Sequence, residues 1–164
     1  MNSMRLEKYN ESDKQLYTQL VFNEDIMKMN LGRVFTAEEA EMAFQMVIMQ
    51  NASESQLGVY KVFICEAGEE EYIGMGALCL NEEYSAVEIE FMILPQYWNH
   101  GYGTILVRNL TDIAAASEAD TQVIAITDPS NVFSQKTLQR NGFSFVKQYL
   151  NEDGEMAMLY QKKA

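Results

Sequence analysis

Residues 88–103, EIEFMILPQYWNHGYG, run directly into an amphipathic segment and form the most informative stretch of this sequence. The stretch opens with an apolar run typical of a buried strand, and Pro95 ends it because proline cannot donate a hydrogen bond to a sheet. Gly101 and Gly103 follow, and glycine lets the backbone approach a ligand closely because it has no Cβ. The apolar spacing that comes next predicts a helix over residues 103–117, whose first N–H groups and positive dipole end would face the same loop. A strand, a glycine loop and a helix start in this order predict an anion-binding site suited to a pyrophosphate.

Two common nucleotide-binding patterns do not fit this loop. A dinucleotide fingerprint needs a third glycine three residues after Gly103, and that position is Leu106. A phosphate-binding Walker loop needs Gly-Lys followed by Ser or Thr, and the sequence contains no such tripeptide. The predicted anion site therefore belongs to neither of these classes.

The rest of the chain alternates strand-like and helix-like segments. Runs of apolar and β-branched residues predict strands over residues 4–7, 57–66, 72–80, 87–94, 122–127, 143–150 and 155–161. Helical spacing, a capping box at Thr36–Glu39 and a terminating Gly142 predict further helices over residues 12–23, 36–50 and 132–141. The order β-α-α-β-β-β-α-β-α-β-β predicts one α/β domain over residues 1–164. We expect a mixed, mostly antiparallel sheet of about seven strands flanked by about four helices.

Composition narrows the class of protein. Hydrophobic residues make up 48% of the chain and charged residues 22%, which are ordinary values for a globular domain. No apolar run reaches the roughly 20 residues of a membrane-spanning helix, and the first residues lack the apolar core of a signal peptide. Cys65 and Cys79 both lie in apolar strand-like runs, which indicates buried thiols in a reducing compartment rather than a disulfide or a nucleophile. We therefore expect a cytoplasmic protein that does not bind a membrane, and no metal, because no Cys/His cluster has metal-ligand spacing.

The net charge is −12, from 24 acidic and 12 basic residues. This balance disfavours a nucleic-acid partner, because binding to phosphate needs a basic patch. An acidic surface favours cationic partners, although the same acidity also serves solubility alone.

Residues 94–104, LPQYWNHGYGT, resemble the acyl-CoA pyrophosphate loop of the GNAT superfamily of N-acetyltransferases. The superfamily pattern is Gln/Arg-x-x-Gly-x-Gly/Ala, and Trp98 stands here in place of Gln or Arg. A Tyr-Trp pair before the glycines is common in the subfamily of ribosomal-protein alanine acetyltransferases. Four further segments resemble that subfamily in the same order, so that the likeness spans nearly the whole chain: residues 23–29, 35–40, 131–134 and 138–143.

The resemblance implies that acetyl-CoA is the co-substrate and that the main chain of the loop holds its pyrophosphate. It also implies a strand bulge at residues 92–94, whose main chain would pair with the pantetheine arm and whose free N–H could hold the thioester oxygen. The residues so implied in cofactor binding are Met92, Ile93, Leu94, Asn99, His100, Gly101, Tyr102, Gly103, Thr104, Asn131 and Ser134.

Forming an amide from a thioester requires an amine that has lost a proton and a leaving thiolate that gains one. Glu88 is the first candidate base, because the resemblance places a glutamate in that strand position. Glu90 shares its face two residues on, so the choice between the two stays open, as does a plain solvated glutamate. Ser134 is the candidate acid, since many superfamily members use a tyrosine where this chain has Leu138, and its alternative role is a local helix hydrogen bond. His100, the single histidine, is interpreted as a loop residue.

The sequence thus predicts an acetyl-CoA-dependent N-acetyltransferase. The subfamily likeness suggests a protein N-terminal α-amine as acceptor, whereas the acidic charge suggests a small cationic amine such as a polyamine or an aminoglycoside. Trp98 and Leu138 depart from the superfamily pattern and leave an alternative, a non-catalytic acyl-CoA-binding regulatory module. We expect acceptor specificity in residues 23–35 and in the final hairpin, and the likeness is also compatible with a homodimer.

Overall fold

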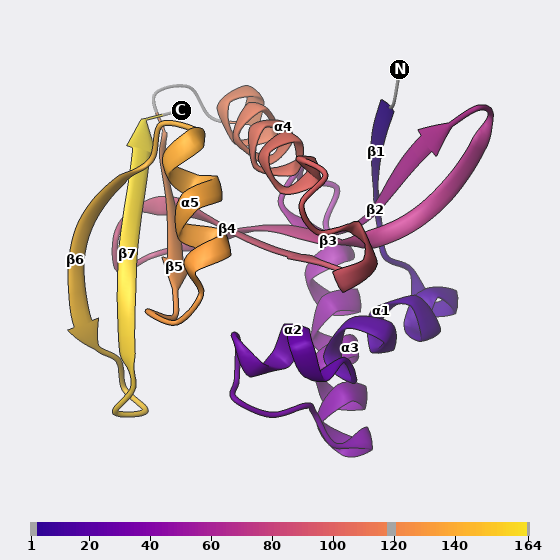
Figure 1. Cartoon of the computed structure of the whole chain (residues 1–164), viewed down its shortest axis with the longest axis horizontal. Coiled ribbons are helices and arrows are strands. Elements are labelled where there is room, and N and C mark those ends of the chain that lie inside the picture. Colours follow the sequence, from indigo (N-terminus) through magenta and orange to yellow (C-terminus); the bar gives the residue numbers. More distant parts are fainter. Residues whose placement is uncertain (1–2, 118–120, 164) are drawn as a thin grey trace.

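The computed structural model describes residues 3–117 and 121–163, and a seven-stranded sheet crosses the whole molecule (Figure 1). The sheet order is β1-β2-β3-β4-β5-β7-β6, and each neighbouring pair is antiparallel except β4 and β5. The strands are β1 (Ser3–Lys8), β2 (Gly58–Glu66), β3 (Glu69–Asn81), β4 (Ala86–Ile93), β5 (Gln122–Thr127), β6 (Ser144–Leu150) and β7 (Met156–Lys163). The predicted fold class and the predicted mixed, mostly antiparallel sheet are confirmed.

Helices cover both faces of this sheet. They are α1 (Lys14–Val21), α2 (Glu24–Lys28), α3 (Ala37–Asn51), α4 (Tyr102–Ser117) and α5 (Val132–Arg140), with 3₁₀ turns η1 (Glu11–Asp13) and η2 (Pro95–Tyr97). Helix α2 adds to the four helices that the sequence predicts. Its five residues are too few to show a helical period, and its start is fixed locally because the Asn23 side chain accepts a hydrogen bond from the Ile26 amide at 3.1 Å.

The side chains of β4 alternate between two cores. Val87 and Ile89 pack in the core beneath α4, whereas Met92 packs in the core beneath α1–α3. Glu88 and Glu90 share the alternation of Met92, and the ladder between β3 and β4 has no register shift that would separate them. Both glutamates therefore share one face of β4, which is the prediction from the sequence, and this face is the side of α1–α3.

Strands β4 and β5 pair over a short length and then diverge. Their parallel pairing consists of Val87 with Val123 and Glu88 with Ile124. Beyond these pairs the two strands run in clearly different directions, so the sheet opens between its two halves (Figure 1). The bulge expected at residues 92–94 is not found in the β3–β4 ladder, which continues to Ile93. The register shifts of the sheet lie between Val62 and Phe63 in the β2–β3 pair and between Phe145 and Lys147 in the β6–β7 pair. The unpaired edge of β4 arises from the divergence of β5 and not from a bulge.

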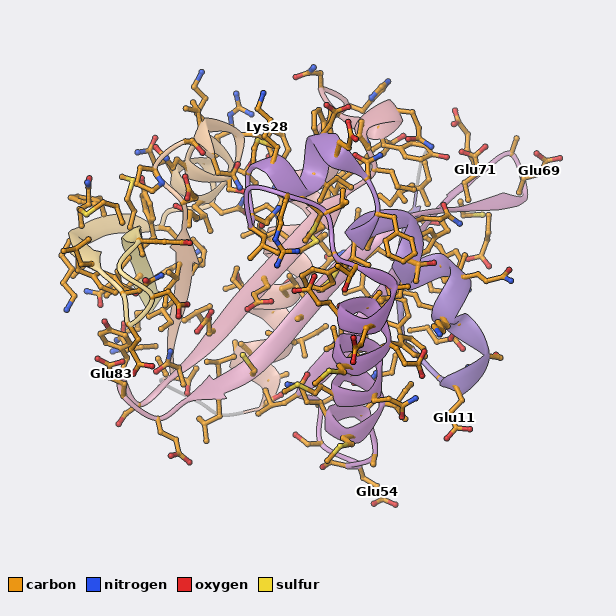
Figure 2. The ribbon with its side chains drawn as sticks, turned by 90° about the horizontal axis from the view of Figure 1, so that it is seen from below. Glu11, Lys28, Glu54, Glu69, Glu71 and Glu83 are labelled. Atoms are coloured by element: carbon orange, nitrogen blue, oxygen red, sulfur yellow. The ribbon has the colours of Figure 1, made fainter. Side chains whose placement is uncertain are left out.

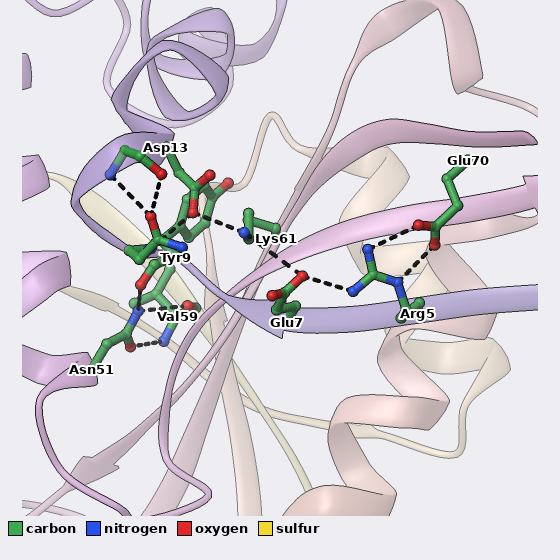
Figure 3. A network of polar contacts seen from close by, with 10 residues as sticks. Arg5, Glu7, Tyr9, Asp13, Asn51, Val59, Lys61 and Glu70 are labelled. Carbon is green, nitrogen blue, oxygen red and sulfur yellow. Dashed lines mark hydrogen bonds and ion pairs between the residues drawn. The ribbon is translucent and has the colours of Figure 1, made fainter.

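A polar network joins the N-terminal elements to β2 (Figure 3). Lys61 is buried, and its Nζ lies 2.8 Å from Asp13 in η1 and 3.7 Å from Glu7 in β1. The Asn51 side chain donates to the Val59 carbonyl at 2.9 Å and accepts from the Val59 amide at 2.8 Å. Because a buried lysine needs counter-charges, this network fixes η1, and with it α1, against the sheet.

Acidic side chains are spread over the outside of the molecule. Figure 2 shows Glu11, Glu54, Glu69, Glu71 and Glu83 pointing away from the body of the protein. These residues are exposed, so part of the net charge is a solvated surface, as the sequence allows. Among the described helices, none is long and apolar enough to cross a membrane.

Candidate active site

Three adjoining cavities follow the opening between β4 and β5. The loop cavity, of about 490 Å³, lies between residues 97–104 and α5. The strand cavity, of about 310 Å³, lies between β4, the end of β5 and the β6–β7 hairpin. A small connecting cavity of about 20 Å³ shares Phe133 with the loop cavity, and Met92, Asn131 and Ser134 with the strand cavity. Together they form one cleft with two distinct ends.

The backbone shapes the loop cavity. Asn99 and Gly101 both have left-handed conformations, with φ of 63° and 82°. A Cβ at Gly101 would meet nothing within 4 Å, so the conformation alone favours glycine there. At Gly103 a Cβ would lie 3.0 Å from the Phe133 ring, so this glycine allows α4 to approach α5 closely. The loop thereby brings the first amides of α4, including that of Thr104, to the cavity wall, where helix N–H groups lack partners within the helix.

Lys136 and Arg140 supply positive charge to the loop cavity. They lie one helical turn apart on α5 and are the basic residues among the described lining of this cavity. Two cations opposite a helix N-terminus make a site for phosphate groups. The sequence analysis missed both residues, although their four-residue spacing on a predicted helix beside the loop was a usable signal.

Trp98, which stands in place of the Gln or Arg of the superfamily pattern, lines the connecting cavity. Its indole N–H donates to the Ile93 carbonyl at 2.7 Å, and its ring stacks on Phe133 with centroids 6.4 Å apart. The substitution therefore ties the end of β4 to α5, and its single donor is already used by the protein.

His100 and Leu94 lie beside the cleft rather than on its wall. The His100 ring stacks on Tyr102 and its Nδ1 is 2.8 Å from the Trp98 carbonyl oxygen. Leu94 is buried, and its amide donates to the Ile73 carbonyl at 2.8 Å. Neither lines one of the three cavities. Their cofactor roles remain predictions, whereas Asn99, Gly101, Gly103 and Thr104, with Tyr102, line the loop cavity.

The strand cavity is acidic. Glu88, Glu90, Asp128 and Glu155 line it, and its described lining contains no lysine, arginine or histidine. Glu88 accepts a hydrogen bond from the Asn81 side chain at 3.0 Å. The carboxylates of Glu90 and Glu155 make no hydrogen bond or ion pair with any residue that the structure describes. Carboxylates gathered without a counter-charge give this end of the cleft a negative electrostatic potential.

Glu90 is crowded by protein although its side chain reaches solvent through the cavity. This desolvation, followed by the charge of Glu88, raises the pKa of Glu90. Burial, followed by the charge of Glu90, also raises the pKa of Tyr17 to about 12. Burial and then the charges of Glu88 and Glu90 raise the pKa of Cys79 to about 12. The Cys79 thiol therefore stays protonated at neutral pH, which argues against a nucleophilic role.

Asn131 and Ser134 lie where the connecting and strand cavities meet. Both are buried, and Asn131 caps α5 by accepting a hydrogen bond from the Ser134 amide at 3.1 Å. The Ser134 hydroxyl makes no hydrogen bond to a described residue, in contrast to Thr137, whose hydroxyl donates to the Phe133 carbonyl at 2.9 Å. The local helix bond that was the alternative role of Ser134 is thus not formed, and its hydroxyl is available to the cleft.

Thr127, at the end of β5, also lines the strand cavity. Its hydroxyl is buried and has no hydrogen-bond partner among the described residues. The sequence analysis did not single out this residue, because a threonine at the end of a buried strand has no local signature.

Comparison with protein families decides the class of protein. The family described as the acetyltransferase (GNAT) domain matches residues 3–144. The chain belongs to the GNAT acetyltransferase family. Members of this family are N-acetyltransferases that use acetyl-CoA, and this GNAT domain is therefore an enzyme with acetyl-CoA as its acetyl donor.

Solved structures share the GNAT fold at low sequence identity. A GNAT acetyltransferase from Bacillus anthracis has a TM-score of 0.77 at 17% identity, with 98% of this chain and 94% of that chain covered. An aminoglycoside acetyltransferase in complex with coenzyme A has a TM-score of 0.77 at 18% identity, with 98% of this chain and 95% of that chain covered. A spermidine N-acetyltransferase from Vibrio cholerae, in complex with CoA and spermine, has a TM-score of 0.73 at 15% identity, with 98% of this chain and 95% of that chain covered. At these identities the likeness shows the fold alone. No curated protein matches the sequence significantly.

The cleft of this GNAT domain fits acetyl-CoA by the chemistry of its donor groups. The amides at the start of α4, with Lys136 and Arg140, would hold phosphate groups in the loop cavity. The unpaired edge of β4 near Met92 and Ile93 would offer main-chain groups to the pantetheine amides. The narrow connecting cavity then leads to Ser134 and the carboxylates.

Proposed function

We propose that this GNAT domain transfers the acetyl group of acetyl-CoA to a primary amine of a small cationic acceptor. The observation that carries the proposal is the acidic lining of the strand cavity, which meets the connecting cavity at Ser134. Four carboxylates with no basic neighbour among the described residues of the cavity wall attract an ammonium group and repel anions. Aminoglycoside and spermidine acetyltransferases of the same fold act on such amines, which supports this acceptor class.

We place Glu90 as the general base, acting directly or through one water. An aliphatic amine arrives as an ammonium ion, with a pKa of roughly 10 as in lysine, and must lose a proton before it attacks. The raised pKa of Glu90 makes it a stronger base than an ordinary glutamate, and its carboxylate has no partner among the described residues. Glu88, held by Asn81, supplies the neighbouring negative charge. This choice differs from the first candidate of the sequence analysis.

We place Ser134 as the donor to the departing sulfur. Acetyl-CoA supplies the acetyl group as a thioester, so one C–N bond forms and one C–S bond breaks. The ammonium group passes its first proton to Glu90 before it attacks. The Ser134 hydroxyl donates its proton to sulfur, and the second proton that nitrogen loses as the amide forms returns to Ser134, directly or through water. Asn131 fixes the first turn of α5 and so positions Ser134.

A second acceptor class is the α-amine of a protein. It is supported by the resemblance of residues 131–134 and 138–143 to the ribosomal-protein alanine acetyltransferases.

We extend the proposal to a cytoplasmic location, which is supported by Cys65 and Cys79 both remaining outside a disulfide. A homodimer stays a prediction of the family likeness, and sedimentation at several protein concentrations tests it.

The deciding experiment measures kcat/KM for acetylation of three acceptor classes: polyamines, aminoglycosides and a peptide with an N-terminal alanine. We expect a small cationic amine to be the best acceptor, with the acetylated product verified by mass. A higher kcat/KM for the peptide than for the small amines would instead identify the protein α-amine as the acceptor. Calorimetric binding of acetyl-CoA, with NADH as control, accompanies the assay. Binding without turnover of any amine would contradict the proposal and support the non-catalytic module instead.

A further inference from the structure

Helix α3 carries an apolar row on its outer face. Met42, Met46 and Met49 are 64%, 61% and 75% exposed, whereas Phe44 and Val47 on the inner face of the same helix are buried. The spacing i, i+4 and i+7 places the three methionines along one side of the helix, and we call them the methionine row. The outer positions of a surface helix are normally polar, and a contiguous exposed apolar patch marks an interaction site.

A hollow of about 360 Å³ lies beside the end of the methionine row. Its lining includes Gln50, the next residue of α3, and Leu80 of β3, which is 57% exposed. Another part of its wall is fixed, because the Lys8 Nζ donates to the carbonyl oxygens of Ser53 and Ser55 at 3.2 Å and 2.6 Å. An apolar row that ends at a fixed hollow matches a groove for a helix, in which one anchor side chain of the partner fills the hollow.

The charges around the methionine row are acidic. Residues 36–57, which include all of α3, contain four glutamates and no lysine, arginine or histidine. Two of these glutamates are paired with basic side chains of other segments. The other two, Glu38 and Glu54, make no hydrogen bond or ion pair with any residue that the structure describes. Glu38 lies in the first turn of α3 and Glu54 lies just beyond its last turn, so both ends of the row carry unpaired negative charge (Figure 2).

We propose that this face of α3 docks a cationic amphipathic helix of a partner protein. Apolar residues of the partner would cover the methionine row, and one of them would enter the hollow. Lysine or arginine residues toward its two ends would pair with Glu38 and Glu54. Methionine suits such a surface because its side chain is unbranched and polarisable and adapts to the shape of its partner.

A second copy of this chain is the wrong occupant for the face. Glu38 and Glu54 lie eight positions before and after Met46, so a two-fold axis at Met46 would bring Glu38 of one copy toward Glu54 of the other. Each copy also has a net charge of −12. Like charges that oppose each other disfavour an interface, and the same acidic ends repel the anionic headgroups of a membrane. Charge complementarity therefore selects a cationic partner.

This docking surface is separate from the cleft. The methionine row, Glu38 and Glu54 line none of the three cavities. Occupation of the surface should therefore leave the acetylation of a small amine unchanged, and the proposal does not depend on the identity of the acceptor.

The test measures the binding of three fluorescent peptides of roughly 18 residues, five helical turns, by anisotropy. The first has leucine at the i, i+3, i+4 and i+7 positions of a helix and lysine elsewhere. The second has the same composition in scrambled order, and the third has glutamate in place of lysine. At about 0.15 M salt, which screens long-range attraction, we expect the first to bind at least tenfold more tightly than either control. Equal binding of the first two would mean attraction by net charge alone and would overturn the docking site.

Matched variants locate the surface that binds the peptide. The triple variant Met42→Gln, Met46→Gln and Met49→Gln keeps good helix formers but removes the apolar row. It should weaken binding by about tenfold or more and leave the melting temperature unchanged, because the three side chains are exposed. Leucine at the same three positions should keep the binding. Leu31→Gln with Leu150→Gln, which removes exposed apolar side chains elsewhere, should not affect it.

The acidic ends are tested in the same way. Glu38→Gln with Glu54→Gln should weaken the first peptide by about fivefold, as for two exposed ion pairs, whereas Glu69→Gln with Glu83→Gln should have less effect. Both the triple glutamine variant and the Glu38/Glu54 variant should keep the wild-type kcat/KM for a small amine.

Three results would overturn the proposal. The first is peptide binding that the triple glutamine variant leaves intact. The second is self-association of the wild type that the same variant abolishes, which would assign the face to a second copy. The third is binding to phosphatidylserine-containing vesicles that the variant abolishes, which would assign the face to a membrane.

Discussion

Glu88 and Glu90 share one face of β4 but differ in their surroundings, and this difference predicts distinct pH profiles for their variants. Glu88 contributes to the raised pKa of Glu90, because a like charge disfavours the ionised form. The Glu88→Gln variant lacks that charge, so the pKa of Glu90 falls. The acidic limb of the pH profile of kcat/KM should therefore move to lower pH. Glu90→Gln should lower kcat by about 10²- to 10⁴-fold, the usual contribution of a general base.

The control for these profiles is Glu83→Gln, which removes an exposed charge outside the strand cavity. It should leave the acidic limb in place. An acidic limb that stays fixed or moves to higher pH in Glu88→Gln would exclude the coupling between the two glutamates, and full activity of Glu90→Gln would exclude Glu90 as the base.

The same raised pKa makes a prediction about stability. A carboxyl whose pKa is higher in the folded than in the unfolded state binds its proton more tightly when folded, so stability falls as pH rises between the two values. Above both pKa values, the cost of ionising this partly desolvated carboxyl is fully present. Glu90→Gln should therefore raise the melting temperature of the ligand-free protein at pH 8, and this gain should shrink near pH 4. A lower melting temperature at pH 8 would contradict the assignment of Glu90 as a destabilising, functional charge.

At the scale of elements, α5 carries Lys136 and Arg140, the two cations that we expect to hold the phosphate groups of acetyl-CoA. Lys136→Ala and Arg140→Ala should each raise the KM for acetyl-CoA by about tenfold, since a charge-assisted hydrogen bond contributes roughly 1.5–3 kcal/mol, and should leave kcat nearly unchanged. Both side chains are exposed, so the melting temperature should not move. Arg108→Ala, an exposed arginine on α4 outside the three cavities, is the control. An equal rise of KM in Arg108→Ala would indicate a general effect of charge rather than a phosphate site.

The loop before α4 allows a second matched comparison. Gly101 and Gly68 have nearly the same left-handed conformation, with φ of 82° and 83°, and a Cβ at either would meet nothing within 4 Å. Alanine at each position should cost about 1–2 kcal/mol of stability, because the left-handed region is unfavourable for a residue with a Cβ. Gly101→Ala alone should also raise the KM for acetyl-CoA. An unchanged KM would show that the loop conformation is not needed for binding.

Sequence reasoning succeeded where the signal is local. The helical period of α4, the capping box at Thr36 and the glycine loop are patterns within a few residues, and the structure has all three. It failed where geometry depends on distant segments. The divergence of β5 from β4, which opens the cleft, leaves no mark within either strand. Likewise, the unpaired hydroxyl of Thr127 and the crowding of Glu90 exist only once β5, α1 and the hairpin have packed.

At the scale of the whole molecule, the two ends of one cleft carry opposite charge. Lys136 and Arg140 line the loop cavity, whereas the strand cavity has carboxylates alone among its described charged residues. The chain as a whole has a net charge of −12. Its long-range field therefore attracts a cationic acceptor and repels the anionic donor, and the donor depends on the local cations once it reaches the surface.

This arrangement predicts opposite salt responses for the two substrates. Raising the ionic strength from roughly 0.01 M to 1 M shortens the Debye length from about 30 Å to about 3 Å, which removes long-range attraction and repulsion alike. The kcat/KM for a diamine acceptor should fall, by about tenfold or more if association is electrostatically steered. The kcat/KM for acetyl-CoA should fall far less or rise, because screening also relieves its repulsion by the acidic surface. A monoamine, with one charge instead of two, should show a smaller fall than the diamine. Equal falls for acetyl-CoA, monoamine and diamine would mean that salt inhibits the enzyme without regard to charge, and the acidic surface would then have no part in selecting the acceptor.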